Sequence, residues 1–508
     1  MTRYGFLIDQ DSCIGCHACS VACKSENDVP LGVNRTWLKY IEKGTFPETR
    51  RLYSVMRCNH CENPPCVAIC PTGALFKRAD GIVDFDTSAC IGCKSCMNAC
   101  PYDAIYIDPE EHTAQKCNFC SHRIELGLEP ACVVVCPTQA IVAGDLDDPT
   151  SKIARMVARS DVHVRAPEQG TRPKLFYRGA DEASLVPTRS AIPPDGLMWA
   201  EATAGHPTPP ADGNGSGDIV ARTVHTTAHP APWGAKVSAY LVTKALGAGA
   251  LMIAALLVAL GGAGNQLAVG VLPPVLAGTF LGLTGVLLVA DLKQPKRFHF
   301  LLTRPNWTSW LARGSIVLGL YALVAAAWFL AGLLDATGAV QALAVPGVLL
   351  GAAAAGYTAY LFGQCEGRDF WQTPLLLPIL LAQAVVAGAA LFLVADLFVT
   401  VPEAGAVRWA LLGGLAAVAI LAGAEVTARG SVPVELAAHA MTRGAYARRF
   451  WGLGVLVGMA VPAVLVVAAL AGIPGATAAA ALAGVAAVAG LAGFEDAFVR
   501  AGQSVPLS

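Results

Sequence analysis

The stretch CIGCKSCMNACP, residues 90–101, places four cysteines at the spacing C-x2-C-x2-C-x3-C and follows the last one with a proline. Two similar groups precede it and one follows it. The four groups together hold 16 of the 17 cysteines of the chain. The groups are Cys13, Cys16, Cys19 and Cys23; Cys58, Cys61, Cys66 and Cys70; Cys90, Cys93, Cys96 and Cys100; and Cys117, Cys120, Cys132 and Cys136. So many thiols in a short stretch indicate disulfides, zinc sites or iron–sulfur clusters.

The spacing distinguishes these three kinds of site. The N-terminal stretch MTRYGFLIDQDSC has neither an apolar segment nor twin arginines, so we expect no export signal and no disulfide scaffold. Zinc sites use two pairs of ligands, whereas a run of three cysteines plus one suits a cubane cluster. In such a run the fourth cysteine is expected to open a helix and to bind a second cube. Sixteen thiolates satisfy four 4Fe-4S clusters with none left over, so the sequence predicts four.

Short apolar segments follow the cysteine groups. GIVDF (81–85) and AIYID (104–108) are rich in β-branched and aromatic residues and predict strands. The repetition of cysteine group and strand predicts a duplicated α+β module, with the second and third groups in the inner copy.

These motifs also resemble a known family. RCNHCENPPCVAICPTGAL (57–75) and IGCKSCMNACPYDAI (91–105) are similar to the four-cluster ferredoxin subunit of the DMSO reductase and formate dehydrogenase family, and the resemblance covers residues 4–160. It implies that the first group pairs with the fourth and the second with the third. The implied ligand sets are Cys13, Cys16, Cys19 and Cys136; Cys117, Cys120, Cys132 and Cys23; Cys58, Cys61, Cys66 and Cys100; and Cys90, Cys93, Cys96 and Cys70. The last set is expected nearest the membrane, and the intact Cys93 implies four irons in it.

The C-terminal half is strongly apolar. Hydrophobic residues make up 54% of the chain and charged residues 14%, and the mean hydropathy is +0.51. Eight apolar runs of about 20 residues are long enough to cross a bilayer. They are 237–261, 268–290, 313–333, 345–363, 375–397, 407–425, 450–471 and 477–498.

The predicted fold is therefore an α+β duplicated bacterial ferredoxin domain with four 4Fe-4S clusters, followed by an all-α bundle of eight transmembrane helices. The expected divisions are an electron-transfer domain at 1–185, a linker at 186–235 and a membrane anchor at 236–508. The linker contains AGHPTPPADGNGSGD (204–218), which is too polar and too rich in Gly and Pro to form a core.

Basic residues predict the orientation of the spans. With eight spans, the cysteine-rich domain and the C-terminus lie on the same side of the membrane. Twelve lysines and arginines flank the spans on that side, and only Arg408 flanks them on the other. Because basic loops normally face the cytoplasm, we expect a multi-pass protein of the cell (inner, cytoplasmic) membrane with its ferredoxin domain on the cytoplasmic side.

The histidines bear on the electron acceptor. All ten lie outside the predicted spans, whereas a haem bound between membrane helices takes axial histidines from them. We therefore expect no haem. The electrons would then pass from the last cluster to a lipid-soluble quinone, either menaquinone or ubiquinone, as an exchangeable substrate.

The membrane half resembles the haem-free anchors of the polysulfide reductase (NrfD-like) family. The similar segments are VADLKQPKRF (289–298), LTRPNWTSWLARG (302–314) and GYTAYLFGQCEGRDFWQTPLLLP (356–378). The resemblance implies a quinone site near the membrane surface on the cluster side. Its implied residues are Lys236 and Tyr240 in the first span, Asp291 at the end of the second and Tyr357 in the fourth. The family has Asn and His at the first-span positions, so this sequence departs from the pattern there.

The side chains themselves favour the same site, because reduction of a quinone consumes protons as well as electrons. Asp291 is an ionisable residue at membrane depth, which is typical of a functional residue. Its alternative role is an ion pair with Lys293 or Arg297. Tyr357 can donate a hydrogen bond to a quinone, and its alternative role is packing.

Lys236, Tyr240 and Lys244 recur at i, i+4 and so share one face of the first span. Their alternative role is anchoring at the membrane interface, where lysines extend towards water and tyrosines form a belt. Cys365, outside the four groups, is expected to be a small buried apolar residue.

The predicted function is that of an electron-transfer and membrane-anchor subunit with a quinone redox site. Nothing in the sequence binds molybdopterin, so we expect a separate molybdopterin-containing catalytic large subunit as partner. The net charge of −1 carries no information on a nucleic-acid partner, and no basic domain suggests one, so the other expected partners are membrane lipid and quinone, with no nucleic acid.

The alternative is an energy-converting, proton-translocating quinone oxidoreductase module of a larger complex. Ionisable residues deep in several spans would favour it. Glu366, Asp369, Asp396 and Glu425 instead lie at the ends of predicted spans, which favours plain quinone chemistry.

Overall fold

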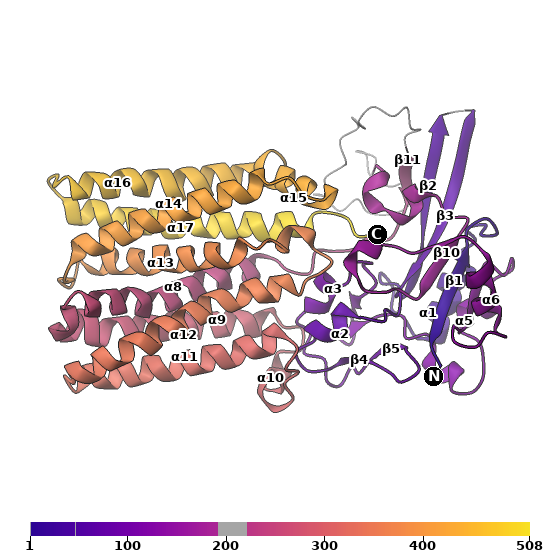
Figure 1. Ribbon diagram of the computed structural model, residues 1–508, viewed down its shortest axis with the longest axis horizontal. Coiled ribbons are helices and arrows are strands. Elements are labelled where there is room, and N and C mark those ends of the chain that lie inside the picture. The colour runs from indigo at the N-terminus through magenta and orange to yellow at the C-terminus, as the bar shows by residue number, and fades with distance from the viewer. Residues whose placement is uncertain (1, 46, 192–220) are drawn as a thin grey trace.

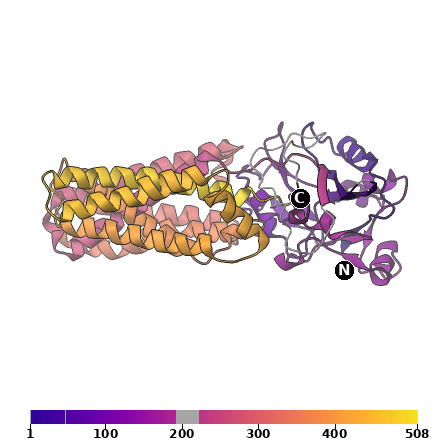
Figure 2. The same ribbon diagram turned by 90° about the horizontal axis from the view of Figure 1, so that it is seen from above.

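The computed structural model describes residues 2–45, 47–191 and 221–508, and Figure 1 shows a cysteine-rich domain placed against one end of a long helical bundle. The view turned by 90° shows the same end-to-end arrangement (Figure 2). The C-terminus lies beside the cysteine-rich domain (Figure 1), as an even number of spans requires. The predicted linker stretch at 204–218 lies outside the described residues.

A four-stranded sheet forms the outer part of the cysteine-rich domain. Its order is β8 (Ile141–Asp145), β1 (Tyr4–Asp9), β10 (Leu175–Arg178) and β9 (Val162–His163). β1 pairs antiparallel with β8 and parallel with β10. Because side chains alternate along a strand, Phe6 and Ile8 face the cysteines, whereas Leu7 packs with Ile153 of α6 (Lys152–Arg159). The sheet therefore joins the beginning and end of this domain.

A second sheet contains β11 (Ala221–His225), β2 (Thr36–Thr45) and β3 (Glu48–Arg57) in that order. β11 pairs antiparallel with β2 and lies within the linker predicted at 186–235. That prediction was too long at its C-terminal end, because alternating residues such as Ala221 and Thr223 bury one face of a strand that composition alone does not reveal.

Short elements carry the cysteines. The hairpins are β4 (Leu75–Lys77) with β5 (Val83–Phe85) and β6 (Tyr106–Ile107) with β7 (Ala114–Gln115), which confirms the strands predicted in GIVDF and AIYID. The helices are α1 (Ala18–Glu26), α2 (Pro65–Ile69), α3 (Ser95–Ala99), α4 (Ser121–Ile124), α5 (Ala131–Val134) and α7 (Glu182–Leu185), with single turns η1 (Pro167–Gln169) and η2 (Pro187–Arg189). Helix α1 packs against α5, and α2 packs against α3.

The expected position of the fourth cysteine of each group was wrong. In the two inner groups the third cysteine, Cys66 or Cys96, lies inside a short helix, and the fourth, Cys70 or Cys100, caps its C-terminal end. A five-residue helix thus spans the distance between the two cysteines. The third cysteine lies in the first turn of this helix and the fourth directly follows its last residue, so the helix does not begin at the fourth cysteine.

Eight helices of the described chain are long and apolar enough to cross a membrane, which confirms the eight predicted spans. They are α8 (Ala235–Ala259), α9 (Leu272–Asp291, preceded by the π-helical η4, Gln266–Val271), α11 (Trp310–Leu333), α12 (Thr337–Gly363), α13 (Leu376–Ala395), α14 (Ala404–Thr427), the π-helical η7 (Arg448–Ala460) with α16 (Val461–Leu470), and α17 (Ala476–Gln503). The short connecting helices are η3 (Gly262–Gly264), η5 (Pro295–Arg297), α10 (Phe300–Thr303), η6 (Asp369–Trp371) and α15 (Val432–Thr442).

Helix α8 lies at the centre of the bundle and packs against α9, α12, α13 and α17. Gly249 of α8 meets Gly388 of α13, where the two backbones approach so closely that a Cβ on Gly249 would overlap the carbonyl oxygen of Ala384. In lipid, such small residues allow the close packing that stabilises helix pairs.

Replacing Gly249 by alanine should therefore destabilise the bundle by about 1–3 kcal/mol, because a buried methyl group would force the two backbones apart. The measurement is the apparent Tm of the purified protein in detergent. Gly282→Ala in α9 is the matched control, since its added Cβ meets no atom within 4 Å. An equal Tm for both variants would contradict the proposed close packing.

Candidate functional site

Two cavities in the cysteine-rich domain are each walled by cysteines of two different groups. Cys58, Cys61, Cys66 and Cys100 line the first. Cys70, Cys90, Cys93 and Cys96 line the second. Helix α2 lies between them, with Cys66 on one cavity and Cys70 on the other. The structure thus brings together both inner sets in the grouping that the sequence analysis expected.

The outer groups are interleaved in the same way. Cys13 is influenced electrostatically by Cys16 and Cys136, and Cys23 by Cys120 and Cys132. The amide nitrogen of Asn27 lies 3.8 Å from the sulfurs of both Cys23 and Cys120. Cys117 neighbours Cys23 and Cys120 as well. Packing of α1 against α5 therefore places the last cysteine of each outer group beside the other group.

The chemistry of these thiols fits iron–sulfur clusters. Burial, as the main cause, raises the pKa of Cys93 and of Cys100 to about 12, and neighbouring thiols add to it. Metal ligation needs thiolates, so these thiols bind as ligands only where a positively charged iron core offsets their burial. Among the described residues, no three Cys, His, Asp or Glu side chains are arranged to hold a single metal ion.

Arg57 is a buried cation between the cysteine sets. Its side chain is fully buried, and Nη1 donates a hydrogen bond of 3.1 Å to the sulfur of Cys132. Cys117 and Cys19 also interact with its charge, and the ring of Phe6 lies 4.5 Å below it. Nε and Nη2 find no hydrogen-bond partner among the described residues. The guanidinium is therefore balanced by sulfur and not by a carboxylate.

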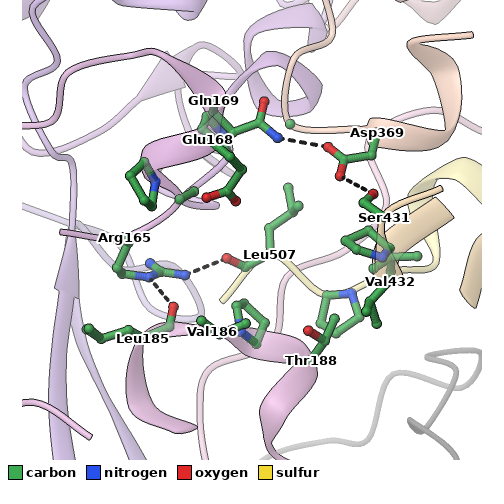
Figure 3. Close-up of a pocket in the computed structure, with 18 of the residues that line it drawn as sticks. Arg165, Glu168, Gln169, Leu185, Val186, Thr188, Asp369, Ser431, Val432 and Leu507 are labelled. Carbon is green, nitrogen blue, oxygen red and sulfur yellow. Dashed lines mark hydrogen bonds between the residues drawn. The ribbon is translucent and has the colours of Figure 1, made fainter. Parts of the chain in front are cut away.

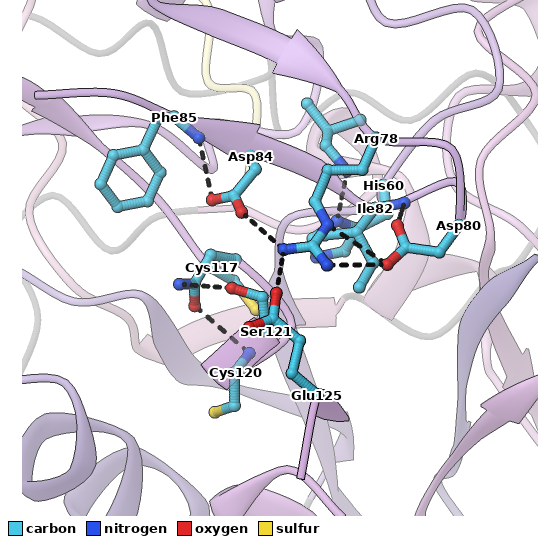
Figure 4. A network of polar contacts seen from close by, with 12 residues as sticks. His60, Arg78, Asp80, Ile82, Asp84, Phe85, Cys117, Cys120, Ser121 and Glu125 are labelled. Atoms are coloured by element: carbon cyan, nitrogen blue, oxygen red, sulfur yellow. Dashed lines mark hydrogen bonds and ion pairs between the residues drawn. The ribbon is translucent and has the colours of Figure 1, made fainter. Parts of the chain in front are cut away.

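A polar network fixes the loop that carries Cys117 and Cys120 (Figure 4). Arg78, which follows β4, donates a hydrogen bond of 3.2 Å to Asp80. It also makes ion pairs with Asp84 at 3.6 Å and with Glu125 at 2.8 Å. Glu125 directly follows α4, so these bonds hold that helix against the β4–β5 hairpin.

The turn around Cys93 rests on the membrane helices. The backbone N–H groups of Lys293 and Gln294 donate to the carbonyls of Gly92 and Ile91. Trp233, just before α8, donates from its indole to the carbonyl of Cys93 at 3.3 Å. Gly92 has a φ of +67°, and a Cβ there would overlap the side chain of Lys293. A glycine at this position is thus required by both the turn and the close approach.

An ion pair crosses the same interface. The ammonium of Lys94 lies 2.8 Å from the carboxylate of Asp291, and the two side chains are only 9% and 17% exposed. The sequence analysis had offered Lys293 or Arg297 as the partner of Asp291. Arg297 instead donates to the backbone carbonyls of Thr87 and Cys90. No sequence pattern connects residue 94 with residue 291, so this pairing was missed.

A cavity of about 90 Å³ lies next to this ion pair. Three of the predicted quinone residues, Tyr240, Asp291 and Tyr357, line it together with Cys93. Its other walls are mostly apolar, and they include Trp233, which the sequence analysis did not single out. One cavity therefore touches both a predicted cluster ligand and three predicted quinone contacts.

Lys236 does not line this cavity. It is exposed, and its ammonium donates at 2.6 Å to the carbonyl of Ala290 at the end of α9. Lysine at the C-terminal end of a helix satisfies a free carbonyl there. Lys236 thus lies on the rim, as the interfacial alternative expected.

Lys244 behaves oppositely, because it is 2% exposed and not at the interface. Its ammonium donates to the carbonyl of Ala355 at 2.9 Å and to the hydroxyl of Thr358. It also lies 5.0 Å over the ring of Tyr357, which packs closely on Gly314. The interfacial interpretation was therefore wrong for Lys244. Cys365 is fully buried, as expected.

Another cavity, of about 920 Å³, lies elsewhere along the junction of the two parts (Figure 3). There Arg165 donates to the carbonyls of Leu185 and Leu507, and Asp369 accepts from Gln169 and Ser431 at 2.8 Å each. No cysteine lines it. It is separate from the cysteine cavities and has no evident role in their chemistry.

Interleaved cysteine sets docked on eight apolar helices define a membrane-anchored iron–sulfur protein. Comparison with protein families agrees, since residues 12–75 and 49–146 each match the 4Fe-4S dicluster domain. Residues 223–505 match the family described as polysulphide reductase, NrfD. The protein therefore belongs to the polysulphide reductase NrfD family and carries iron–sulfur domains fused to its multi-pass membrane part.

About a third of this protein is similar to subunits of reductases. One component of the tetrathionate reductase of Salmonella typhimurium is 45% identical over 203 residues, which are 39% of this protein and 80% of that one. One component of the polysulfide reductase of Wolinella succinogenes is 44% identical over 180 residues, 34% of this protein and 93% of that one. The arsenate respiratory reductase iron–sulfur subunit of a Shewanella species is 37% identical over 225 residues, which are 34% of this protein and 95% of that one. These similarities support electron transfer and membrane anchoring.

Arg57 should raise the reduction potential of the clusters beside it, because a buried positive charge favours the more negative reduced state. Arg57→Gln should lower a midpoint potential, and each tenfold loss in reduced fraction corresponds to about 59 mV for one electron. Potentiometric titration followed by electron paramagnetic resonance measures the shift, and Arg57→Lys should restore most of it. Unchanged potentials in Arg57→Gln at full iron content would contradict this role.

Proposed function

We propose that this protein relays electrons between a separate catalytic subunit and the membrane quinone pool, menaquinone or ubiquinone. One observation carries the proposal: the same cavity is bounded by Cys93 on one side and by Asp291, Tyr240 and Tyr357 on the other. A quinone ring there would lie directly against a cluster ligand. The division of labour follows the expected limits, with electron transfer in 1–185 and the anchor in 236–508.

The proposed iron–sulfur centres are four 4Fe-4S clusters. Their ligands are Cys13, Cys16, Cys19 and Cys136; Cys117, Cys120, Cys132 and Cys23; Cys58, Cys61, Cys66 and Cys100; and Cys90, Cys93, Cys96 and Cys70. The shared cavities and interleaved outer helices support these sets. When bound, such clusters carry single electrons. The last set lies at the membrane junction, since Asn306 donates to the carbonyl of Cys70.

In the proposed quinone site each side chain has a distinct role. Asp291 can exchange a proton with the quinone, and Lys94 holds its carboxylate in place. Tyr357 can donate a hydrogen bond to a quinone oxygen, and its ring is positioned by Lys244 and Gly314. The hydroxyl of Tyr240 makes no hydrogen bond within the described chain and is available to the same ligand. Lys236 is proposed only as a residue of the rim.

The proposed partner is a molybdopterin-containing large subunit, as the resemblance to the DMSO reductase and formate dehydrogenase family implies. The similar proteins of Salmonella typhimurium and Wolinella succinogenes are each named as one component of a reductase, which supports a multi-subunit complex.

A second candidate function is an energy-converting, proton-translocating module. Lys244 and Glu495 favour it, because both are buried within spans, and ionisable residues deep in the spans are what such a module needs.

Iron analysis tests the number of clusters. Fully loaded protein should contain sixteen irons per chain, four for each cysteine set, and show no b-type haem absorption band. Cys70→Ser should remove the signal of one cluster together with its four irons and leave the other three. About eight irons in fully loaded protein would contradict the proposal.

Asp291→Asn and Tyr357→Phe should impair quinone turnover and leave the clusters intact. Loss of a buried hydrogen-bond donor or acceptor costs about 1–3 kcal/mol, or about 5- to 150-fold in rate. In the complete complex, electron exchange between the partner and an artificial dye should stay near wild type while exchange with a quinol analogue falls. Unchanged quinol activity in both variants would overturn the quinone site.

The side of the membrane is tested by protease accessibility. We propose that the iron–sulfur domain is cytoplasmic, because basic residues concentrate at that end of the spans. A protease site introduced into residues 204–218 should be cut in inverted membrane vesicles and protected in intact spheroplasts. Cleavage in spheroplasts would place the domain on the outer side.

A further inference from the structure

Three ionisable side chains lie buried between the membrane helices, outside the cavity that holds the proposed quinone site. Lys244 of α8, Glu495 of α17 and Glu425 of α14 are 2%, 2% and 6% exposed. Burial of such groups among apolar helices is costly, so they typically mark the path of an ion or a proton. None of these three side chains lines the cavity, so the proposed quinone site does not explain why they are buried.

These groups are neighbours in a series. Lys244 and Glu495 act on each other electrostatically, and Glu495 acts on Glu425. Their helices are in contact, since α17 packs against both α8 and α13, and α13 packs against α14. The side chain of Gln383 in α13 lies close to Glu495, but its amide nitrogen makes no hydrogen bond of ordinary geometry to the carboxylate. Its amide nitrogen and one carboxylate oxygen of Glu425 are buried without partners among the described residues. A water molecule between the side chains would give each of these atoms a hydrogen-bond partner.

One end of the series reaches the quinone cavity. The ammonium of Lys244 is hydrogen-bonded to Thr358 and lies over the ring of Tyr357, which lines that cavity. A proton on Lys244 is therefore one side chain away from the site at which a quinone would bind.

The other end of the series, Glu425, is buried close to the end of α14. Glu425 lies two residues before the end of α14, at the end that faces the iron–sulfur domain (Figure 1). Lys244 lies nine residues after the start of α8 and Glu495 eight before the end of α17, or about 12–14 Å deep at 1.5 Å per residue. All three lie in the nearer half of a bilayer core of about 30 Å. In the farther half, no Asp, Glu, Lys or Arg of the described spans is buried.

We propose that Glu425, Glu495 and Lys244 conduct protons between the aqueous surface on the iron–sulfur side and the quinone cavity. This inference rests on the proposed quinone function. Reduction of one quinone takes two electrons from the iron–sulfur domain and two protons through this series, and it forms the two O–H bonds of the quinol. Oxidation of a quinol returns both protons by the same route. Electrons and protons then enter from the same side, so this series serves quinone chemistry and by itself carries no proton across the membrane.

The test compares Glu495→Gln and Glu425→Gln with wild type in the complete complex. Each should lower kcat with a quinol analogue by about tenfold or more, because a proton carrier is lost, and leave KM and dye activity near wild type. Glu495→Asp should recover much of the kcat. Asp496→Asn is the control, since Asp496 pairs with Arg449 and Arg500 outside the series. Wild-type kcat in both glutamine variants would overturn the route.

Failure of the route and failure of the quinone site have different signatures. If Asp291→Asn impairs quinol turnover and Glu495→Gln does not, the quinone site stands and the proton route falls. If Asp291→Asn and Tyr357→Phe also leave quinol turnover unchanged, the quinone site itself is wrong.

A second measurement does not depend on the variants assembling. Dicyclohexylcarbodiimide reacts with carboxyl groups that carry a proton in an apolar environment. It should modify Glu425 or Glu495 of the wild-type complex and inhibit quinol turnover without loss of dye activity, with the modified residue identified by peptide mass spectrometry. Modification of neither residue, or full quinol turnover after modification of both, would overturn the inference.

Discussion

The contact between the Cys93 turn and the ends of the membrane helices determines how the last cysteine set meets the membrane half. Backbone carbonyls in this turn are buried by the docking, and a buried carbonyl without a donor is costly. The membrane half supplies the donors: Trp233 to Cys93, Arg297 to Cys90 and Asn306 to Cys70. The two halves are thus complementary in hydrogen bonding, and this complementarity places Cys93 on the wall of the cavity proposed to bind quinone.

Charge follows the same arrangement. The cysteine-rich domain places Lys94 next to Cys93, and the membrane half supplies Asp291 as its partner. Neither charge is therefore buried alone. Deeper in the domain, the groups of the described chain that balance the charge of Arg57 are cysteine sulfurs. These cations lie where negative charge accumulates on reduction. Assembly of the clusters and stability of the domain are therefore coupled, because loss of iron would leave Arg57 without its balancing charge.

The sequence analysis predicted the parts whose signal is local. Cysteine spacing predicted the iron–sulfur domain, and runs of apolar residues predicted eight spans, because both depend on neighbours along the chain. Three features were beyond its reach. The Lys94–Asp291 pair joins residues 197 positions apart. The burial of Lys244 depends on α12 and α17, which surround it, and β11 forms only because β2 offers a free edge. In each case the deciding partner comes from a distant segment.

Strand β11 has a further consequence, because it pairs with β2 and lies only ten residues before α8 begins at Ala235. The chain thus enters the membrane half almost directly from a strand that is paired within the cysteine-rich domain. A short tether of this kind gives each half a high effective concentration around the other, about millimolar for flexible linkers. Docking then needs only modest affinity of its own. The hydrogen bonds, the Lys94–Asp291 ion pair and the buried apolar cluster that runs through both halves can then keep the junction closed more easily than they would between two separate subunits.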